Sequence, residues 1–381
     1  MNLFDVYPLF DITPVKAEGT FIWDDKGTKY LDFYGGHAVI SIGHSHPHYV
    51  KKLDEQISQI AFYSNAVKMP LQNLLAEQLG KLSGYTDYNL FLCNSGTEAN
   101  ENAFKLASFH NGRKKVIAFK DSFHGRTSLS LGATDDAKLS ANINKDHHVV
   151  FLPFNDVDAF KNAIDEATCA VIIEGIQGVG GINVPSPDFL RMLETECNKL
   201  GVVLILDEIQ SGYGRSGKFF AHQHSAIQPH IITTAKGMGN GFPVAGVLIH
   251  PDIKAKHGML GTTFGGNYLA CAASLSVLEV IENENLISNA KETGNFIMTE
   301  LKKMEGVKSV RGLGLMIGIE TEGDANLIRK KLLQDEKIFT GFSSGKNTIR
   351  LLPPLNITIE EAQMFLNSIN TILQQQLIPN T

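Results

Sequence analysis

The stretch from residue 202 to residue 240 constrains the fold more than any other part of this chain. Its first residues, Val202 to Leu206, form a continuous apolar run rich in β-branched side chains, which is typical of a strand covered on both faces. Asp207 follows at the expected strand end. A second short run begins at Ile231, and Lys236 stands just beyond its end. Because ligands bind outside the carboxyl ends of parallel strands, we expect Asp207 and Lys236 to point into one crevice.

An acid and an amine that converge in this way suit a pyridoxal phosphate site. The lysine amine reacts with the aldehyde of the cofactor, and the aspartate keeps the pyridine nitrogen protonated so that the ring accepts electrons. The alternative is a structural salt bridge, which is the commoner explanation for an arbitrary pair of this kind. The residues that flank the pair favour the cofactor site.

Ten motifs in the chain resemble those of the class III aminotransferases of ornithine and acetylornithine type. In chain order they are YLDFYGG, GHSHP, NSGTEANENAFKLA, FHGRT, IIEGIQG, DEIQSGYGRSGKFFA, TTAKGMGNGFPVA, TTFGGN, RGLGLMIGIE and RLLPPLNIT. The resemblance implies an α/β chain with the fold-type I architecture of aspartate aminotransferase. It further implies a large domain, 46–281, with a mostly parallel seven-stranded sheet, and a smaller α/β domain, 282–381. An N-terminal arm, 1–45, is expected to pack with the small domain.

The apolar patterns agree with this architecture. Residues 115–119, 149–152 and 170–173 read as strands, with a helix predicted over 157–166 between the last two, as in a parallel sheet. Residues 71–82 carry apolar side chains at helical spacing. The stretch from Tyr88 to Gly112 reads as a strand, a tight turn and a long helix ended by glycine.

Composition limits the partners. The net charge of −6 and the lack of a basic run argue against nucleic acid, and a small metabolite fits better. Because the sequence shows neither a membrane span nor a signal peptide, we expect a cytoplasmic protein. The four cysteines are widely spaced without a CxxC pair, so neither disulfides nor a zinc site is indicated. A metal site at His44, His46 and His48 is disfavoured, because Gly43 and Pro47 interrupt a regular strand.

The predicted cofactor contacts begin at the start of the helix after NSG. Ser95, Gly96 and Thr97 offer backbone N–H groups, hydroxyls and the positive end of a helix dipole to a phosphate; an ordinary N-cap is the alternative. The resemblance implies that Phe123 stacks on the cofactor ring, with a core phenylalanine as the alternative. It also assigns Gln210 to the cofactor.

The loop TTFGGN carries a separate expectation. Within the family, Thr263 reaches the phosphate of the neighbouring subunit's cofactor, while Thr262 lies near substrate. The resemblance therefore implies a homodimer with shared active sites.

Two arginines are the expected substrate contacts. Arg126 resembles the family arginine that binds the carboxylate remote from the reacting amine, and a guanidinium fits a carboxylate with two hydrogen bonds. Arg350 resembles the one that binds the α-carboxylate of glutamate or 2-oxoglutarate, with an exposed strand arginine as the alternative. Glu174 is expected near the reactive side of the cofactor, beside Asp207.

Two positions depart from the family pattern. Ornithine-type members usually have glutamate where this chain has Val179, and that acid pairs with the arginine that matches Arg350. We hypothesise that the acid is dispensable when the α-amine of the substrate is already acylated, and that its loss admits an acyl group with its own carboxylate. His37, at a position often apolar in the family, could supply a matching donor. Neutral repacking at both positions is the alternative.

The resemblance thus predicts an aminotransferase of arginine biosynthesis. N-acetylornithine is the default donor and N-succinylornithine a close second, with 2-oxoglutarate as acceptor, glutamate and the N-acyl-glutamate 5-semialdehyde as products, and Lys236 moving the proton. Another ω-aminotransferase, acting on ornithine, 4-aminobutyrate or a diamine, is one alternative. A non-catalytic protein that has kept the cofactor fold is the other.

Overall fold

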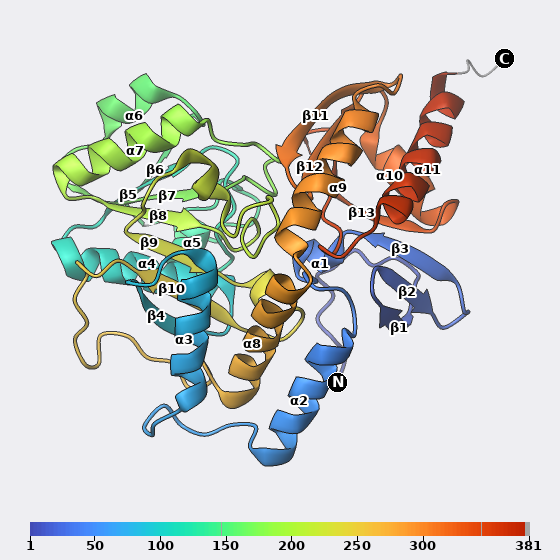
Figure 1. Ribbon diagram of the computed structural model, residues 1–381. Helices are drawn as coiled ribbons and strands as arrows, with labels where there is room; N and C mark the ends of the chain where they lie inside the picture. Colours follow the sequence, from blue (N-terminus) through green and yellow to red (C-terminus); the bar gives the residue numbers. More distant parts are fainter. Residues whose placement is uncertain (146, 344, 378–381) are drawn as a thin grey trace.

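A computed structural model describes residues 1–145, 147–343 and 345–377, and its elements fall around two seven-stranded sheets (Figure 1). The larger sheet has the order β4-β10-β9-β8-β7-β5-β6. Four of its neighbouring pairs are parallel, and only β10 runs against its two neighbours. The predicted mostly parallel seven-stranded sheet is confirmed. Its strands are β4 (Asn89–Cys93), β5 (Lys115–Phe119), β6 (Val149–Leu152), β7 (Thr168–Glu174), β8 (Val203–Asp207), β9 (Ile231–Thr234) and β10 (Ala245–Ile249).

Both faces of the larger sheet are covered, as the apolar run at its centre requires. Ile172 of β7 and Ile205 of β8 pack in the cluster that contains α4 (Gly96–Asn111). Their neighbours Val171 and Leu204 point to the other face, in the cluster formed with α6 and α7. The helices around this sheet are α2 (Pro47–Gln59), α3 (Pro70–Ser83), α4, α5 (Ser128–Gly132), α6 (Val157–Ala163), α7 (Pro187–Leu200) and α8 (Tyr268–Asn283). The helix predicted over 157–166 ends three residues early because the chain turns extended at Ile164.

The smaller sheet joins the two ends of the chain. Its order is β1-β2-β3-β13-β14-β12-β11, and β3 pairs with β13 in parallel. The N-terminal strands therefore lie in one sheet with the C-terminal ones, as the proposed arm requires. The strands are β1 (Pro14–Glu18), β2 (Phe21–Asp24), β3 (Lys29–Phe33), β11 (Val307–Leu313), β12 (Met316–Thr321), β13 (Ile338–Ser343) and β14 (Thr348–Leu351). The helices here are α9 (Leu286–Leu301), α10 (Ala325–Gln334) and α11 (Ile359–Leu377).

The domain boundaries after residues 45 and 281 stay a proposal. Helix α8 runs on to Asn283 and α9 begins at Leu286, so the second boundary falls in the last turn of α8. Arg215 ties the two parts together from a buried position. Its guanidinium donates to the carbonyls of Leu315 and Pro353, next to the smaller sheet, and of Ile40. The cavity described below lies along this junction.

The cysteines are buried, and each histidine of the triplet bonds to an acid. Cys93, Cys169, Cys197 and Cys271 are buried free thiols. His44, His46 and His48 bond separately to Asp32, Glu284 and Glu279. In the described part of the chain, no group of three metal-ligating side chains is placed to hold an ion. None of the described helices is long and apolar enough to cross a membrane.

Candidate active site

The carboxyl edge of the larger sheet brings the predicted acids together. Glu174 ends β7 and Asp207 ends β8, and the two residues are direct partners in the parallel register. Thr233 of β9 is the partner of Asp207 on the other side, and Lys236 follows that strand by two residues. Phe123 comes from the loop after β5. Adjacent strand ends therefore deliver an amine, two carboxylic acids and an aromatic ring to one place.

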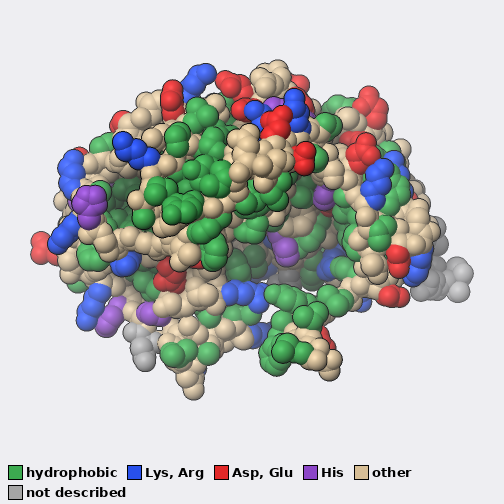
Figure 2. All heavy atoms as spheres, turned by 90° about the horizontal axis from the view of Figure 1, so that it is seen from below, with side chains coloured by type: hydrophobic (Ala, Val, Ile, Leu, Met, Phe, Trp, Pro, Cys, Tyr) green, Lys and Arg blue, Asp and Glu red, His purple; other side chains and the backbone are tan. Residues whose placement is uncertain are grey.

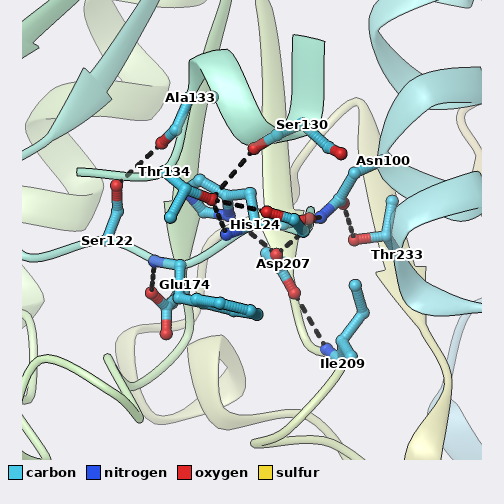
Figure 3. A network of polar contacts seen from close by, with 12 residues as sticks. Asn100, Ser122, His124, Ser130, Ala133, Thr134, Glu174, Asp207, Ile209 and Thr233 are labelled. Carbon is cyan, nitrogen blue, oxygen red and sulfur yellow. Dashed lines mark hydrogen bonds and ion pairs between the residues drawn. The ribbon is translucent and has the colours of Figure 1, made fainter. Parts of the chain in front are cut away.

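Three groups hold the carboxylate of Asp207 (Figure 3). Its Oδ2 lies 2.7 Å from His124 Nδ1 and accepts from Asn100 Nδ2 at 2.8 Å. Its Oδ1 accepts from the backbone N–H of Ile209 at 3.1 Å. Asp207 is only 4% exposed. A buried carboxylate with these partners is held in one orientation.

Asn100 and His124 are site residues that the sequence analysis missed. Asn100 is itself fixed, because its Oδ1 accepts from Thr233 Oγ1 at 2.8 Å and its Nδ2 also donates to the His124 carbonyl at 2.7 Å. The signals were present in the motifs. Asn100 stands one helical turn after Gly96 in NSGTEAN, and His124 lies inside FHGRT.

Lys236 lies at the cavity wall in an unusual backbone conformation. Its φ of 41° is in the left-handed region, which non-glycine residues occupy mainly where surrounding structure enforces it. Burial lowers the pKa of its amine, and the carboxylates of Asp207 and Glu174 partly oppose that shift. A larger share of such an amine is unprotonated, and this is the form that attacks an aldehyde or accepts a proton.

Glu174 is buried and accepts two backbone hydrogen bonds. Its oxygens take the N–H groups of Phe123 and Gly178, each at 2.8 Å. Burial raises the pKa of this carboxyl to about 7, against the lowering effect of those hydrogen bonds. Glu174 is therefore poised to gain or lose a proton near neutral pH.

A cavity of about 830 Å³ joins these groups. The start of α4 forms one part of its wall, with Ser95, Gly96 and Thr97. Ser95 Oγ accepts from the N–H of Glu98 at 3.3 Å, so the N-cap exists, and the helix N-terminus still faces the cavity. A Cβ on Gly96 would meet Ile209 at 2.9 Å, so only glycine lets the chain pass this close.

Two arginines lie in the cavity wall and differ in their exposure to solvent. Arg126 is exposed. Arg350 is 4% exposed, and its Nη2 donates to the Phe342 carbonyl at 3.2 Å. Its Nε and Nη1 are buried and have no hydrogen-bond partner among the described residues. Buried guanidinium N–H groups without an acceptor are groups that a carboxylate can satisfy.

All but two of the predicted site residues line this cavity. Gln210 lies in the wall and donates from Nε2 to the His37 carbonyl at 3.1 Å. Thr262 and Thr263 do not line it. Thr262 Oγ1 accepts from Asn94 Nδ2 at 3.2 Å, and Thr263 is exposed. Their predicted roles require a second copy of the chain, so both stay predictions.

The residues present fit pyridoxal phosphate. A fixed buried carboxylate suits the protonated ring nitrogen, and a lysine with a lowered pKa suits the aldehyde. The helix start with its close-packed Gly96 suits the phosphate.

Comparison with known proteins decides the family. The family described as Aminotransferase class-III matches residues 5–373. The chain belongs to the class-III aminotransferases. Acetylornithine aminotransferase from Bacillus subtilis strain 168 is 40% identical over 371 residues, covering 94% of each chain. The protein of the same name from Bacillus anthracis is 38% identical over 380 residues, covering 98% of this chain and 97% of its own.

Solved structures agree on the fold. Ornithine aminotransferase from Toxoplasma gondii superposes with a TM-score of 0.91 at 29% identity, over 98% of this chain and 93% of its own. A second structure of an ornithine aminotransferase from this organism, with a TM-score of 0.90, is described as showing partial occupancy of PLP at the active site. This class-III chain is thus a PLP-dependent aminotransferase of fold type I, as predicted.

We expect Asn100→Ala to weaken pyridoxal phosphate binding by about tenfold or more. A hydrogen bond to a charged group contributes about 1.5–3 kcal/mol, and tenfold in affinity is about 1.4 kcal/mol. Titration of the apoprotein with the cofactor, followed by absorbance, measures this. Asn102→Ala is the control, because Asn102 lies on the same helix but donates to the Glu98 carbonyl. Equal affinity in the two variants would contradict the positioning role.

The raised pKa of Glu174 predicts that the protein becomes less stable as the pH rises from about 4.5 to about 7. The unfolded carboxyl ionises near 4.5 and the folded one near 7, so unfolding releases a proton between these pH values and stability falls as pH rises. Relative to Glu174→Gln, the wild-type free energy of unfolding should drop by about 3 kcal/mol from pH 4.5 to pH 7 and then level off. Urea denaturation across this range measures the difference. A difference that does not change with pH would exclude the shift.

Proposed function

We propose that the chain transfers the δ-amino group of an N-acylornithine to 2-oxoglutarate, as a step in arginine biosynthesis. N-acetylornithine is the default donor, because the acetylornithine aminotransferases from two Bacillus species match nearly the whole chain. N-succinylornithine is the close second. One observation carries the preference for an acylated donor, namely that Arg350 bonds to the Phe342 carbonyl and to no acid among the described residues.

The Arg350 environment explains this preference. Ornithine-type relatives hold the matching arginine with an acid, and this chain has Val179 there, in the cavity wall and 45% exposed. An arginine without that acid is open to any carboxylate, including the α-carboxylate of free ornithine, which would then present the wrong amine. An acylated α-nitrogen cannot react even if it docks there. The chain therefore needs the acyl group for correct orientation.

Each residue of the site then has its own role in the reaction. Arg126 binds the α-carboxylate remote from the reacting amine, and Arg350 binds a carboxylate of 2-oxoglutarate or glutamate. The bound cofactor supplies an electron sink for the substrate carbon. Lys236 carries the proton between carbons, since its lowered pKa favours the unprotonated amine that accepts a proton. His124 and Asn100 hold Asp207 in place.

We further propose a cytoplasmic homodimer with shared active sites. Thr263 and Phe264 are exposed on a loop next to the cavity, and Phe264 packs with Phe62 at a centroid distance of 5.4 Å. Figure 2 shows hydrophobic side chains gathered on this side of the molecule, beside a hollow. The exposed residues include Ile57, Ile60, Phe62, Tyr63, Val67, Leu74 and Phe264. An apolar surface of this kind favours burial against a second copy. The proposed substrates are intracellular metabolites, which favours the cytoplasm.

A turnover assay tests the function. The purified holoprotein, given 2-oxoglutarate and one donor at a time, should form glutamate from N-acetylornithine or N-succinylornithine at least tenfold more efficiently than from ornithine, 4-aminobutyrate or a diamine. Preference for one of the last three would select the alternative ω-aminotransferase. No glutamate from any donor, with cofactor bound, would favour a protein without turnover.

Val179→Glu tests the Arg350 argument. The new carboxylate should pair with Arg350, which then binds the α-carboxylate of ornithine less readily. We therefore expect kcat/KM for ornithine to rise several-fold relative to kcat/KM for N-acetylornithine. Val179→Gln is the control, because glutamine has nearly the same size as glutamate and carries no charge. An unchanged preference in Val179→Glu would refute the argument.

A further inference from the structure

A left-handed turn of the backbone follows β3 and contributes Gly36 and His37 to the cavity wall. Four consecutive residues, Gly35, Gly36, His37 and Ala38, have φ values of 54°, 53°, 68° and 64°. Glycine adopts this conformation freely, but histidine and alanine do so at a cost. Strain of this kind persists where the surroundings enforce it, and it clusters at functional sites.

Several contacts hold the turn in place. Oδ1 of Asp32 accepts the N–H groups of Tyr34 at 2.9 Å and Gly35 at 2.8 Å, and its Oδ2 lies 2.8 Å from His44 Nε2. A Cβ on Gly35 would meet the Leu352 carbonyl at 2.7 Å, so the turn is pressed against the chain just after Arg350. These contacts fix the backbone on both sides of His37. The turn therefore presents His37 in a set position.

His37 lies in the cavity wall among positive charges. The Tyr34 hydroxyl lies close to both ring nitrogens, 2.5 Å from Nδ1 and 2.8 Å from Nε2. Burial, followed by the cations of Arg350, Lys236 and Arg126, lowers the pKa of His37 to about 4. At neutral pH the ring is uncharged, with one N–H donor and one nitrogen acceptor.

The acids that line the cavity all have partners within the chain. Each carboxylate in its wall already has a partner, as follows: Asp121 with Lys346, Asp135 with Lys120, Asp136 with the Lys138 N–H, Glu174 with two backbone N–H groups, and Asp207 with His124 and Asn100. An ammonium beside His37 would face three cations. An amide there would face a neutral donor and acceptor, which match its own C=O and N–H.

We propose that His37 is a specificity-determining residue that, with the Tyr34 hydroxyl, hydrogen-bonds the amide formed by the acylated α-nitrogen of the substrate. This inference rests on the proposed function and extends it, because it assigns a chain residue to the acylated nitrogen itself. The lack of an acid beside Arg350 in the described structure explains why an acyl group is needed for orientation. His37 explains how the group is recognised.

Steady-state kinetics of the holoenzyme test the proposal with N-acetylornithine and ornithine. His37→Phe keeps a planar ring without hydrogen-bonding groups, and His37→Gln keeps a neutral donor and acceptor. We expect His37→Phe to lower kcat/KM for N-acetylornithine about tenfold without lowering that for ornithine, so the ratio between them falls about tenfold. His37→Gln should keep the ratio within about threefold of wild type. His110→Phe, on the exposed end of α4, should leave both values unchanged.

Three results would overturn the proposal. Equal losses for both substrates in His37→Phe would assign His37 a structural role only. No change in either value in His37→Phe would show that this residue does not recognise the amide. A ratio lost equally in His37→Gln and His37→Phe would exclude hydrogen bonding as the cause. Failure of the proposed function looks different, because wild-type enzyme would then use neither N-acetylornithine nor N-succinylornithine.

Discussion

The structure depends on one buried carboxylate, that of Asp207, and on the groups that hydrogen-bond it. A carboxylate out of water is costly unless it is hydrogen-bonded and paired. Here His124 and Asn100 meet one of its oxygens and a backbone N–H meets the other. Those donors come from the start of α4 and the loop after β5, so the sheet, the helix and the loop must all be in place before the acid is stable. The fold and the site are therefore parts of one arrangement.

Charge in the cavity follows from this arrangement. Glu174, one strand away from Asp207 in the register, has a pKa raised to about 7 by burial. Lys236 and His37 both have lowered pKa values, because burial and neighbouring cations disfavour their charged forms. Groups whose pKa values are shifted by their surroundings in this way are suited to proton transfer at the site. Arg126 and Arg350 are the groups suited to carboxylates.

Much of the fold was predictable because its signals are local. The run from Val202 to Leu206 needs cover on both faces, and an acid after it marks the strand end whatever lies elsewhere. Strand and helix bounds along 89–119 and 149–152 likewise follow from apolar spacing and glycine stops. The early end of α6 at Ala163 was not predictable from spacing, since charged residues continue past it.

The parts of the site that the sequence did not predict depend on contacts between distant residues. Asn100 reads as one polar residue in a helix, and only the fold places it against Asp207 and Thr233. The left-handed turn at His37 cannot be inferred from two glycines, because Asp32 and Leu352 enforce it from outside. The role predicted for Thr263 involves a second copy of the chain, so a single chain does not test it.

The identity of the lysine that binds the cofactor tests the central claim most directly. The purified holoprotein is reduced with borohydride, digested and sequenced by mass spectrometry. The structure predicts the phosphopyridoxyl group on Lys236 alone, and its loss in Lys236→Ala. The group on any other lysine, or on none after the cofactor has been supplied, would contradict the account of the site.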